Sequence, residues 1–159
     1  MCAKFRKGHF EGVLDVMNKL TKIIKPKKIF MGEKDFQQLY LVKNELGKKY
    51  KTKVIPCKTI RDRNNVALSS RNLLLNKSNL IIAAKIYKKL VGIKKIIKNK
   101  KNISTFLNLK KKELKKNYKI KIDYFELRNI NNLKISSTTK NSRLFIAYYL
   151  NNVRLIDNL

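Results

Sequence analysis

The stretch Ile29-Phe30-Met31-Gly32-Glu33-Lys34-Asp35-Phe36-Gln37-Gln38 decides the fold of this 159-residue chain. A short apolar, β-prone run ends in a glycine and passes directly into a charged, helix-forming segment. In α/β proteins this order builds a nucleotide site, because the glycine lets the backbone turn sharply and the next helix offers unpaired N–H groups to an anion. The stretch therefore predicts a strand, a tight turn and a helix around an anionic ligand.

Two side chains after this glycine are suited to that ligand. Lys34 adds a point charge that favours phosphate, and Gln38 follows one helical turn later, so both can face one pocket. On spacing alone a second interpretation stays open, in which Lys34 and Asp35 are the solvated first turn of a helix and Asp35 complements the helix dipole.

Hydrophobic periodicity extends this pattern on both sides. Residues 10–24 have the spacing of a helix, which the pair Lys25-Pro26 ends because proline disfavours a helical residue before it. A second helix is predicted from Asp35 to about Leu46 and is ended by Gly47. Val54-Ile55-Pro56-Cys57 reads as a strand parallel to residues 29–31, since a helix connects the two. Residues 1–58 thus form an α-β-α-β piece, which cannot close a doubly wound sheet unaided.

Residues 59–159 have a different character. Residues 59–76 are polar and lack a clear period, and Asn76 can cap a helix that runs to about Ile97. A further helix is predicted over residues 104–117. Three β-prone runs follow, at residues 121–127, 142–149 and 153–156. Two helices and a small antiparallel sheet predict a second domain of the α+β class.

The charge of the chain raises the possibility of nucleic-acid binding. Thirty-nine basic residues stand against ten acidic ones, for a net charge of +29, but only seven of the basic residues are arginines. Many lysines, such as Lys94, Lys95 and Lys98, fall in a low-complexity stretch in which few aromatic side chains lie between the charges for base stacking. A charge run of this kind is typical of a solvated face, so we expect no specific nucleic-acid partner. A basic nucleic-acid-binding module remains the alternative.

Other classes of protein are not favoured. No apolar run approaches the roughly 18 residues of a membrane span, and the first residues lack the apolar core of a signal peptide. Cys2 and Cys57 have neither a metal-binding spacing nor a disulfide framework. We therefore expect reduced thiols in a cytoplasmic protein that has no membrane partner.

A second polar cluster, Ala67-Leu68-Ser69-Ser70-Arg71-Asn72, lies some thirty residues beyond the first. Two hydroxyls and a guanidinium can wrap a triphosphate and stabilise its charge in a transition state. An isolated cluster of this kind can equally be a polar loop. His9, the only histidine, is interpreted as a structural cap or packing group, because no partner for acid–base chemistry is visible.

Four segments together resemble the pantothenate synthetase (pantoate–β-alanine ligase) family. They are Gly8-His9-Phe10, Gly32 to Gln38, Ala67 to Asn72, and Arg154-Leu155-Ile156-Asp157-Asn158. The resemblance covers nearly the whole chain and is weakest between about Ile81 and Tyr118. Family members also carry a His-x-Gly-His motif near the N-terminus, in the first half of a Rossmann-like domain. The chain therefore resembles the C-terminal part of such an enzyme, without that half.

The resemblance implies a fold and two domains. Residues 1–58 would be part of a Rossmann-like domain that binds ATP and pantoate. Residues 59–159 would be a C-terminal α+β lid domain. Residues 63–66 stand where the family commonly has an Asp-Gly pair, and Lys7 stands where it has a proline after Arg6.

The resemblance also implies the site. The residues implied in ATP binding are Gly32, Glu33, Lys34, Asp35, Ile60, Leu68, Ser69, Ser70 and Arg71. Of these, Lys34, Ser69, Ser70 and Arg71 would be catalytic. Gln38 and Arg6 would bind pantoate. Tyr148, Tyr149 and the segment Arg154 to Asp157 are interpreted as core and domain edge.

The implied reaction uses ATP and Mg²⁺ to convert pantoate to pantoyl adenylate, which β-alanine then attacks to give pantothenate and AMP. No acidic cluster is assigned as metal ligand. The family is commonly homodimeric. We expect this chain alone to be inactive, and the alternatives are a noncatalytic remnant or a split subunit that works with a separate partner.

Overall fold

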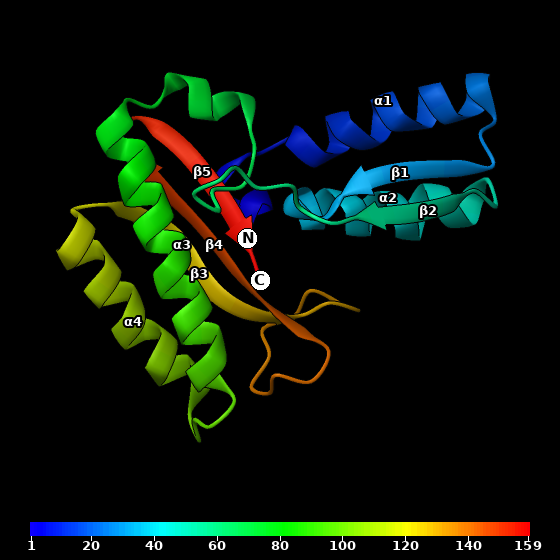
Figure 1. Cartoon of the computed structure of the whole chain (residues 1–159). Coiled ribbons are helices and arrows are strands. Elements are labelled where there is room, and N and C mark those ends of the chain that lie inside the picture. Colours follow the sequence, from blue (N-terminus) through cyan, green and yellow to red (C-terminus); the bar gives the residue numbers. More distant parts are fainter. The chain divides into compact units, whose positions relative to one another are not determined.

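The computed structural model describes residues 1–159, apart from the side chains of residues 3 and 4, and divides into two compact units (Figure 1). The first unit is Met1–Thr59 and the second is Ile60–Leu159. The division falls immediately beyond the domain boundary expected after Lys58. The mixed α/β class, with a parallel sheet in the first unit and an antiparallel sheet in the second, is the predicted one.

The first unit alternates helices and strands. Its elements are a 3₁₀ helix η1 (Cys2–Phe5), helix α1 (His9–Ile24), strand β1 (Lys28–Gly32), 3₁₀ helix η2 (Glu33–Asp35), helix α2 (Phe36–Lys49) and strand β2 (Lys53–Cys57). Strands β1 and β2 are parallel, with Ile29 opposite Val54. The parallel α-β-α-β piece predicted from periodicity is therefore confirmed.

Helices α1 and α2 pack on one face of this two-stranded sheet. Leu39, Val42 and Leu46 of α2 form its small core with Val54 of β2. Because successive strand residues point to opposite faces, Ile29 and Met31 contact that core, whereas Phe30 points away and is 66% exposed. One face of a parallel sheet is thus left without a covering layer in the residues described.

The C-terminal end of α1 was predicted correctly, whereas that of α2 was not. Helix α1 ends at Ile24, where Lys25 adopts a left-handed conformation (φ 49°) and donates its backbone N–H to Thr21 O at 2.9 Å. This confirms the predicted end before Pro26. The predicted end of α2 at Gly47 is wrong, because the helix continues to Lys49. A Cβ at Gly47 would lie 3.2 Å from Thr52 O and 3.4 Å from the Val54 side chain. Gly47 therefore permits close packing of α2 on β2 and does not end the helix.

We expect Gly47→Val to destabilise the first unit by about 1–3 kcal/mol, since a branched side chain there would push helix and strand apart. Urea unfolding followed by circular dichroism measures the change. Gly12→Val is the matched control, because Gly12 lies in α1, where an added Cβ would meet no neighbouring atom within 4 Å. Equal unfolding midpoints for the two variants would contradict the packing role.

The second unit is an α+β arrangement. Its elements are a 3₁₀ helix η3 (Ser70–Leu74), helices α3 (Lys77–Ile97) and α4 (Ile103–Tyr118), and strands β3 (Lys121–Asn129), β4 (Ser142–Leu150) and β5 (Val153–Asn158). The strands form an antiparallel sheet in the order β3-β4-β5. Asn76 caps α3 as predicted, because its Oδ1 accepts a hydrogen bond from Asn79 N at 2.9 Å.

Helices α3 and α4 lie along one face of the three-stranded sheet (Figure 1). Ile86, Leu90 and Ile97 of α3 are almost fully buried against Leu144 and Ile146 of β4. This core is larger than the core of the first unit. It includes residues of both α-helices and of all three strands of the second unit. Val66 and Leu75, in the segment that precedes α3, are buried in the same core.

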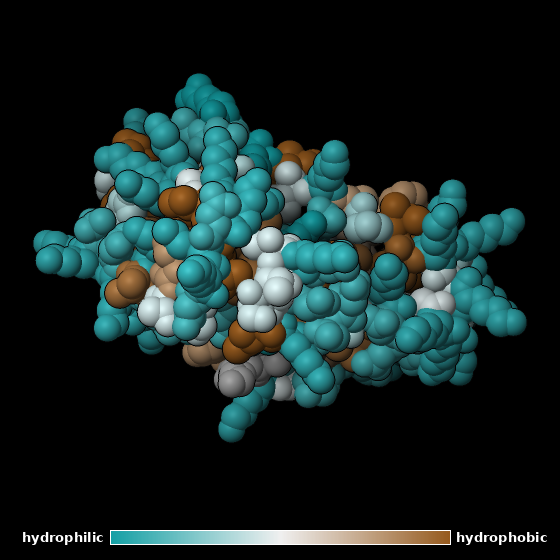
Figure 2. Space-filling model, turned by 90° about the horizontal axis from the view of Figure 1, so that it is seen from below, coloured by the Kyte–Doolittle hydropathy of each residue, from teal (hydrophilic) through white to brown (hydrophobic). Residues whose placement is uncertain are grey.

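The surface is dominated by hydrophilic side chains with scattered apolar ones on the face drawn in Figure 2. No helix in the described part of the chain has both the length and the apolar character needed to cross a bilayer.

Candidate functional site

The first candidate segment begins at the carboxyl end of β1. Gly32 is exposed and extended, and the chain then enters the single 3₁₀ turn Glu33–Asp35 before α2 starts at Phe36. Lys34 and Gln38 are half-buried, on this turn and on the first turn of α2. The strand–glycine–helix order predicted from the sequence is present. Its one local difference is that residues 33–35 form a 3₁₀ turn.

Gln37 adds a feature to this segment that the sequence did not reveal. Its Oε1 is buried and accepts no hydrogen bond from the residues described. A buried polar atom without a partner is uncommon and costs stability. Gln37 is the second residue of α2, so this acceptor lies in the first turn of the helix.

Arg6 and His9 lie at the start of α1. Arg6 is half-buried in the short link between η1 and the helix. The N-cap residue of α1 is Gly8, in a left-handed conformation (φ 71°), so His9 does not cap the helix. The His9 ring packs at 5.0 Å from the ring of Phe10, in agreement with the packing interpretation.

The second candidate segment forms a narrow hairpin, which we call the 60–68 hairpin. Leu68 N donates to Ile60 O at 3.0 Å, and Asp62 N donates to Val66 O at 2.9 Å. Asp62 Oδ1 also accepts the backbone N–H groups of Asn64 and Val66, both at 2.9 Å. A stretch without periodicity in the sequence is therefore closed by its own backbone and by one carboxylate.

Asn65 holds the tip of this hairpin in a left-handed conformation, with φ 65°. Glycine adopts this conformation freely, and asparagine tolerates it better than other side chains do. Asn65 therefore accommodates the turn of the hairpin without a glycine.

This conformation gives a prediction for two variants of one residue. We expect Asn65→Val to destabilise the second unit by about 1–2 kcal/mol, because a β-branched residue is strained at positive φ. Asn65→Gly should change stability by less than about 0.5 kcal/mol. Thermal unfolding of both variants measures this difference, and a Val variant as stable as the Gly variant would contradict the assigned strain.

The hairpin leads directly into Ser69, Ser70 and Arg71. Ser69 is the N-cap of η3, and its Oγ accepts the Arg71 N–H at 3.3 Å. The side chains of Ser70 and Arg71 are exposed, as are those of Ile60 (71%) and Leu68 (52%). The structure brings these five predicted residues together on one segment of the second unit. The other predicted ATP-binding residues, Gly32 to Asp35, lie in the first unit.

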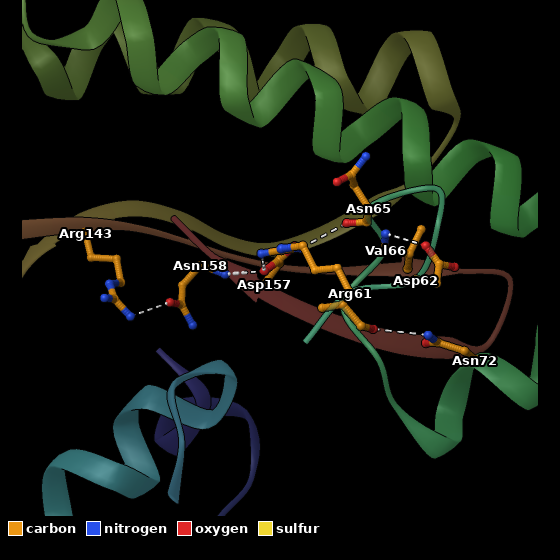
Figure 3. Close-up of polar contacts among 9 residues, drawn as sticks. Arg61, Asp62, Asn65, Val66, Asn72, Arg143, Asp157 and Asn158 are labelled. Carbon is orange, nitrogen blue, oxygen red and sulfur yellow. Dashed lines mark hydrogen bonds and ion pairs between the residues drawn. The ribbon is translucent and has the colours of Figure 1, made fainter. Parts of the chain in front are cut away.

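An ion pair that the sequence reasoning missed holds this segment (Figure 3). Arg61 binds Asp157 of β5 with both branches of its guanidinium, at 2.7 and 2.8 Å. The same guanidinium donates to Asn65 O at 3.1 Å and lies 4.1 Å from the centre of the Tyr87 ring on α3. The two charged side chains are only 17% and 10% exposed. Arg61 therefore joins the hairpin to a helix and to a strand.

The electrostatics agree with a fully charged pair. Burial lowers the pKa of the Arg61 guanidinium, but its hydrogen bond to Asp157 and the charge of that carboxylate outweigh burial and raise the pKa above its ordinary value. Burial, with a smaller contribution from Asp157, also raises the pKa of the neighbouring Tyr148 phenol, which therefore stays neutral.

One signal in the sequence could have found this pair. Asp157 directly follows the predicted β-prone run 153–156, at the end of a segment interpreted as core and domain edge, in a chain with few acidic residues. A carboxylate within a buried strand requires a cation as partner. Arg61 lies next to Ile60, at the start of the polar segment, and arginine is the cation that binds a carboxylate with two parallel hydrogen bonds.

These features define an α/β protein with a glycine turn after a parallel strand, followed by an α+β unit with a second polar loop. The chain belongs to the pantoate–β-alanine ligase family, whose model matches residues 1–159. A pantothenate synthetase of Flavobacterium psychrophilum is 37% identical over the whole chain, and one of Azobacteroides pseudotrichonymphae is 38% identical. The chain spans 57% and 58% of the lengths of these two relatives.

Solved structures agree with this assignment. A crystal structure of pantothenate synthetase from Thermus thermophilus superposes on this chain with a TM-score of 0.88 at 28% identity. The match covers 99% of this chain and 58% of the Thermus thermophilus chain. A ligase from Francisella tularensis, described as complexed with β-γ ATP and β-alanine, gives a TM-score of 0.71 at 34% identity; the chain covers 53% of it. The predicted family and fold class are therefore confirmed, and the share that is covered is the one expected of a C-terminal portion.

Proposed function

We propose that this chain forms part of an enzyme that joins pantoate and β-alanine at the expense of ATP. The observation that carries the proposal is the family match along residues 1–159, together with the two polar segments in the predicted order. The Francisella tularensis relative, in complex with β-γ ATP and β-alanine, supports ATP and β-alanine as substrates.

The proposed reaction has two steps. A carboxylate oxygen of pantoate forms a bond to the α-phosphorus of ATP, and the bond to the β-phosphate bridging oxygen breaks, releasing pyrophosphate. The amine of β-alanine then attacks the acyl carbon of pantoyl adenylate and AMP leaves, giving pantothenate. The first step brings two anions together, so positioning and charge neutralisation are what the protein must supply.

The residues have separate roles in this scheme. Lys34 and Arg71 neutralise phosphate charge, and Ser69 and Ser70 donate hydrogen bonds to phosphate oxygens. The backbone around Gly32 allows a close approach, with Glu33 and Asp35 beside it, and Ile60 and Leu68 line the nucleotide. Gln38 offers both a donor and an acceptor to the hydroxyl and carboxylate of pantoate, and Arg6 offers it a positive charge.

Magnesium enters this scheme with the nucleotide. Among the side chains that the structure describes, no group of three His, Cys, Asp or Glu residues could hold a metal ion. Mg²⁺ commonly keeps its waters and binds substrate phosphates with few protein ligands. We therefore take MgATP as the substrate and assign no protein ligand to the metal.

The test is formation of AMP and pantothenate by the purified enzyme as it occurs in the cell. We expect AMP to form only when ATP, pantoate and β-alanine are all present, and ATP–pyrophosphate exchange to require pantoate alone. ATP–pyrophosphate exchange at the same rate without pantoate would contradict the assignment of pantoate as the substrate. We also expect the enzyme to be cytoplasmic. The complete enzyme should be a homodimer, which gel filtration with light scattering can test.

Two other functions follow from the same sequence. A split subunit would gain activity on mixing with a separate chain that carries the His-x-Gly-His half, whereas a noncatalytic remnant would not. A nucleic-acid-binding protein would hold a defined RNA or DNA at high salt, where nonspecific attraction from the net charge of +29 is screened.

A further inference from the structure

Arg61 connects the 60–68 hairpin to both a helix and the C-terminal strand of its unit, through the Tyr87 ring on α3 and Asp157 on β5. Its Nη1 and Nη2 atoms bind the two carboxylate oxygens of Asp157, a partner 96 residues away in the sequence. Asp157 Oδ1 also accepts the backbone N–H of Asn158 at 2.8 Å. The carboxylate is thus hydrogen-bonded within β5 as well as to the arginine.

Each member of the Arg61–Asp157 pair requires the other, and the arginine cannot be replaced by lysine without loss of contacts. Both side chains are largely buried, so removal of one leaves the other charged, desolvated and without its partner. Lysine cannot replace the planar fork of arginine, because its ammonium makes no bidentate contact and no flat stack on the Tyr87 ring. In a chain whose basic residues are mostly lysine, arginine at this position indicates that the geometry of the contact matters.

The position of Arg61 connects the pair to the candidate site. Arg61 follows Ile60, whose carbonyl accepts the Leu68 N–H, and it faces Ala67 across the hairpin. The strand that leaves the hairpin continues directly into Ser69, Ser70 and Arg71. Asn72 closes the segment from the other side, because its Nδ2 donates to Ala67 O at 3.1 Å.

We propose that the Arg61–Asp157 ion pair is a positioning device, which fixes the 60–68 hairpin on the sheet and so holds Ser69, Ser70 and Arg71 in the geometry that receives the phosphates of ATP. Neither residue touches the nucleotide in this proposal. The proposal rests on the proposed function for the identity of the ligand, but its structural half, the hold on the hairpin, can be tested separately.

Hydrogen exchange on the 159-residue chain tests the structural half. In Asp157→Asn we expect the hairpin amides of Asp62, Asn65 and Leu68 to exchange at least about tenfold faster, while amides at the centre of β4 keep their protection. The matched control is Asp123→Asn, which breaks the 2.8 Å pair between Asp123 and Arg154 in the same unit. Unchanged hairpin exchange, or an equal rise throughout β4, would overturn the proposal.

Kinetics of the complete enzyme test the functional half. We expect Arg61→Lys and Asp157→Asn each to raise the KM for MgATP about tenfold, or about 1.4 kcal/mol, with the KM for β-alanine unchanged. Asp123→Asn should leave both values unchanged. An enzyme that forms pantothenate, with a loosened hairpin in Asp157→Asn but an unaltered KM for MgATP, would refute the positioning role. A wild-type enzyme that forms no pantothenate would instead refute the proposed function, and hydrogen exchange would still decide whether the pair holds the hairpin.

Discussion

Lys34→Ala should lower the rate of pantoyl-adenylate formation by about two to three orders of magnitude, the usual effect of removing one charge-stabilising donor from a transition state. Lys34 lies half-buried on the turn that follows β1, where its ammonium is the positive charge within the predicted ATP-binding segment Gly32 to Asp35. Negative charge shifts between phosphate oxygens as the pantoate carboxylate attacks, so the contact matters more in the transition state than in the bound ground state.

The measurement is pantoate-dependent ATP–pyrophosphate exchange in the complete enzyme, with pantoate affinity measured separately by calorimetry. We expect pantoate binding to weaken by less than about threefold, since Gln38 and Arg6 carry that contact in the proposed scheme. Lys43→Ala is the matched control, because Lys43 is an exposed lysine on α2, the helix that follows the Lys34 turn. Near-wild-type exchange in Lys34→Ala would remove Lys34 from the catalytic group.

Local patterns in the sequence were enough to predict most elements of both units. The short apolar runs that contain Ile29 and Val54 predicted two strands, and the connecting helix predicted their parallel order. The side chain of Asn76 predicted the start of α3, because an N-cap depends only on residues a few positions away. Such features are local, so a single sequence carries them.

Gly47 and Arg61 show what local patterns do not contain. Glycine commonly ends helices, but the reason for Gly47 is the close approach of β2, which the sequence of α2 does not specify. The partner of Arg61 is a carboxylate on another strand, and the hairpin that it holds depends on an Asp62 side chain closing its own loop. Both are consequences of tertiary packing. The roles of Lys34, Ser69, Ser70 and Arg71 likewise stay predictions, because they concern a bound nucleotide.

The exposed apolar side chains of the first unit indicate that it needs a further layer. Phe30 on the uncovered face of β1 is 66% exposed, and Ile23 and Ile24 at the end of α1 are 77% and 65% exposed. Parallel sheets are found almost only with both faces covered, and a sheet of two parallel strands has little stability of its own. The relatives that the chain matches are longer, since it spans 57% of the Flavobacterium psychrophilum synthetase.

We therefore expect the 159-residue chain by itself to form AMP at less than about one-hundredth of the rate that it reaches together with a His-x-Gly-His half, supplied in the same chain or as a separate one. The reason is that this half would both cover the Phe30 face and complete the nucleotide site. AMP release on titration of one purified half into the other measures the effect. Full activity of the chain alone would contradict it.

A variant of Phe30 distinguishes loss of docking to the added half from loss of the chain's own stability. Phe30→Glu places a charge on a side chain that is already exposed, so the chain should keep its own unfolding free energy within about 0.5 kcal/mol. The same charge would be buried against the added half, so the activity gained on mixing should fall at least about tenfold. Ile135→Glu is the matched control, since Ile135 is 68% exposed in the other unit, away from the segment assigned to phosphate. Equal activity gains for the two variants would show that the Phe30 face is not the surface on which the first half of the fold docks.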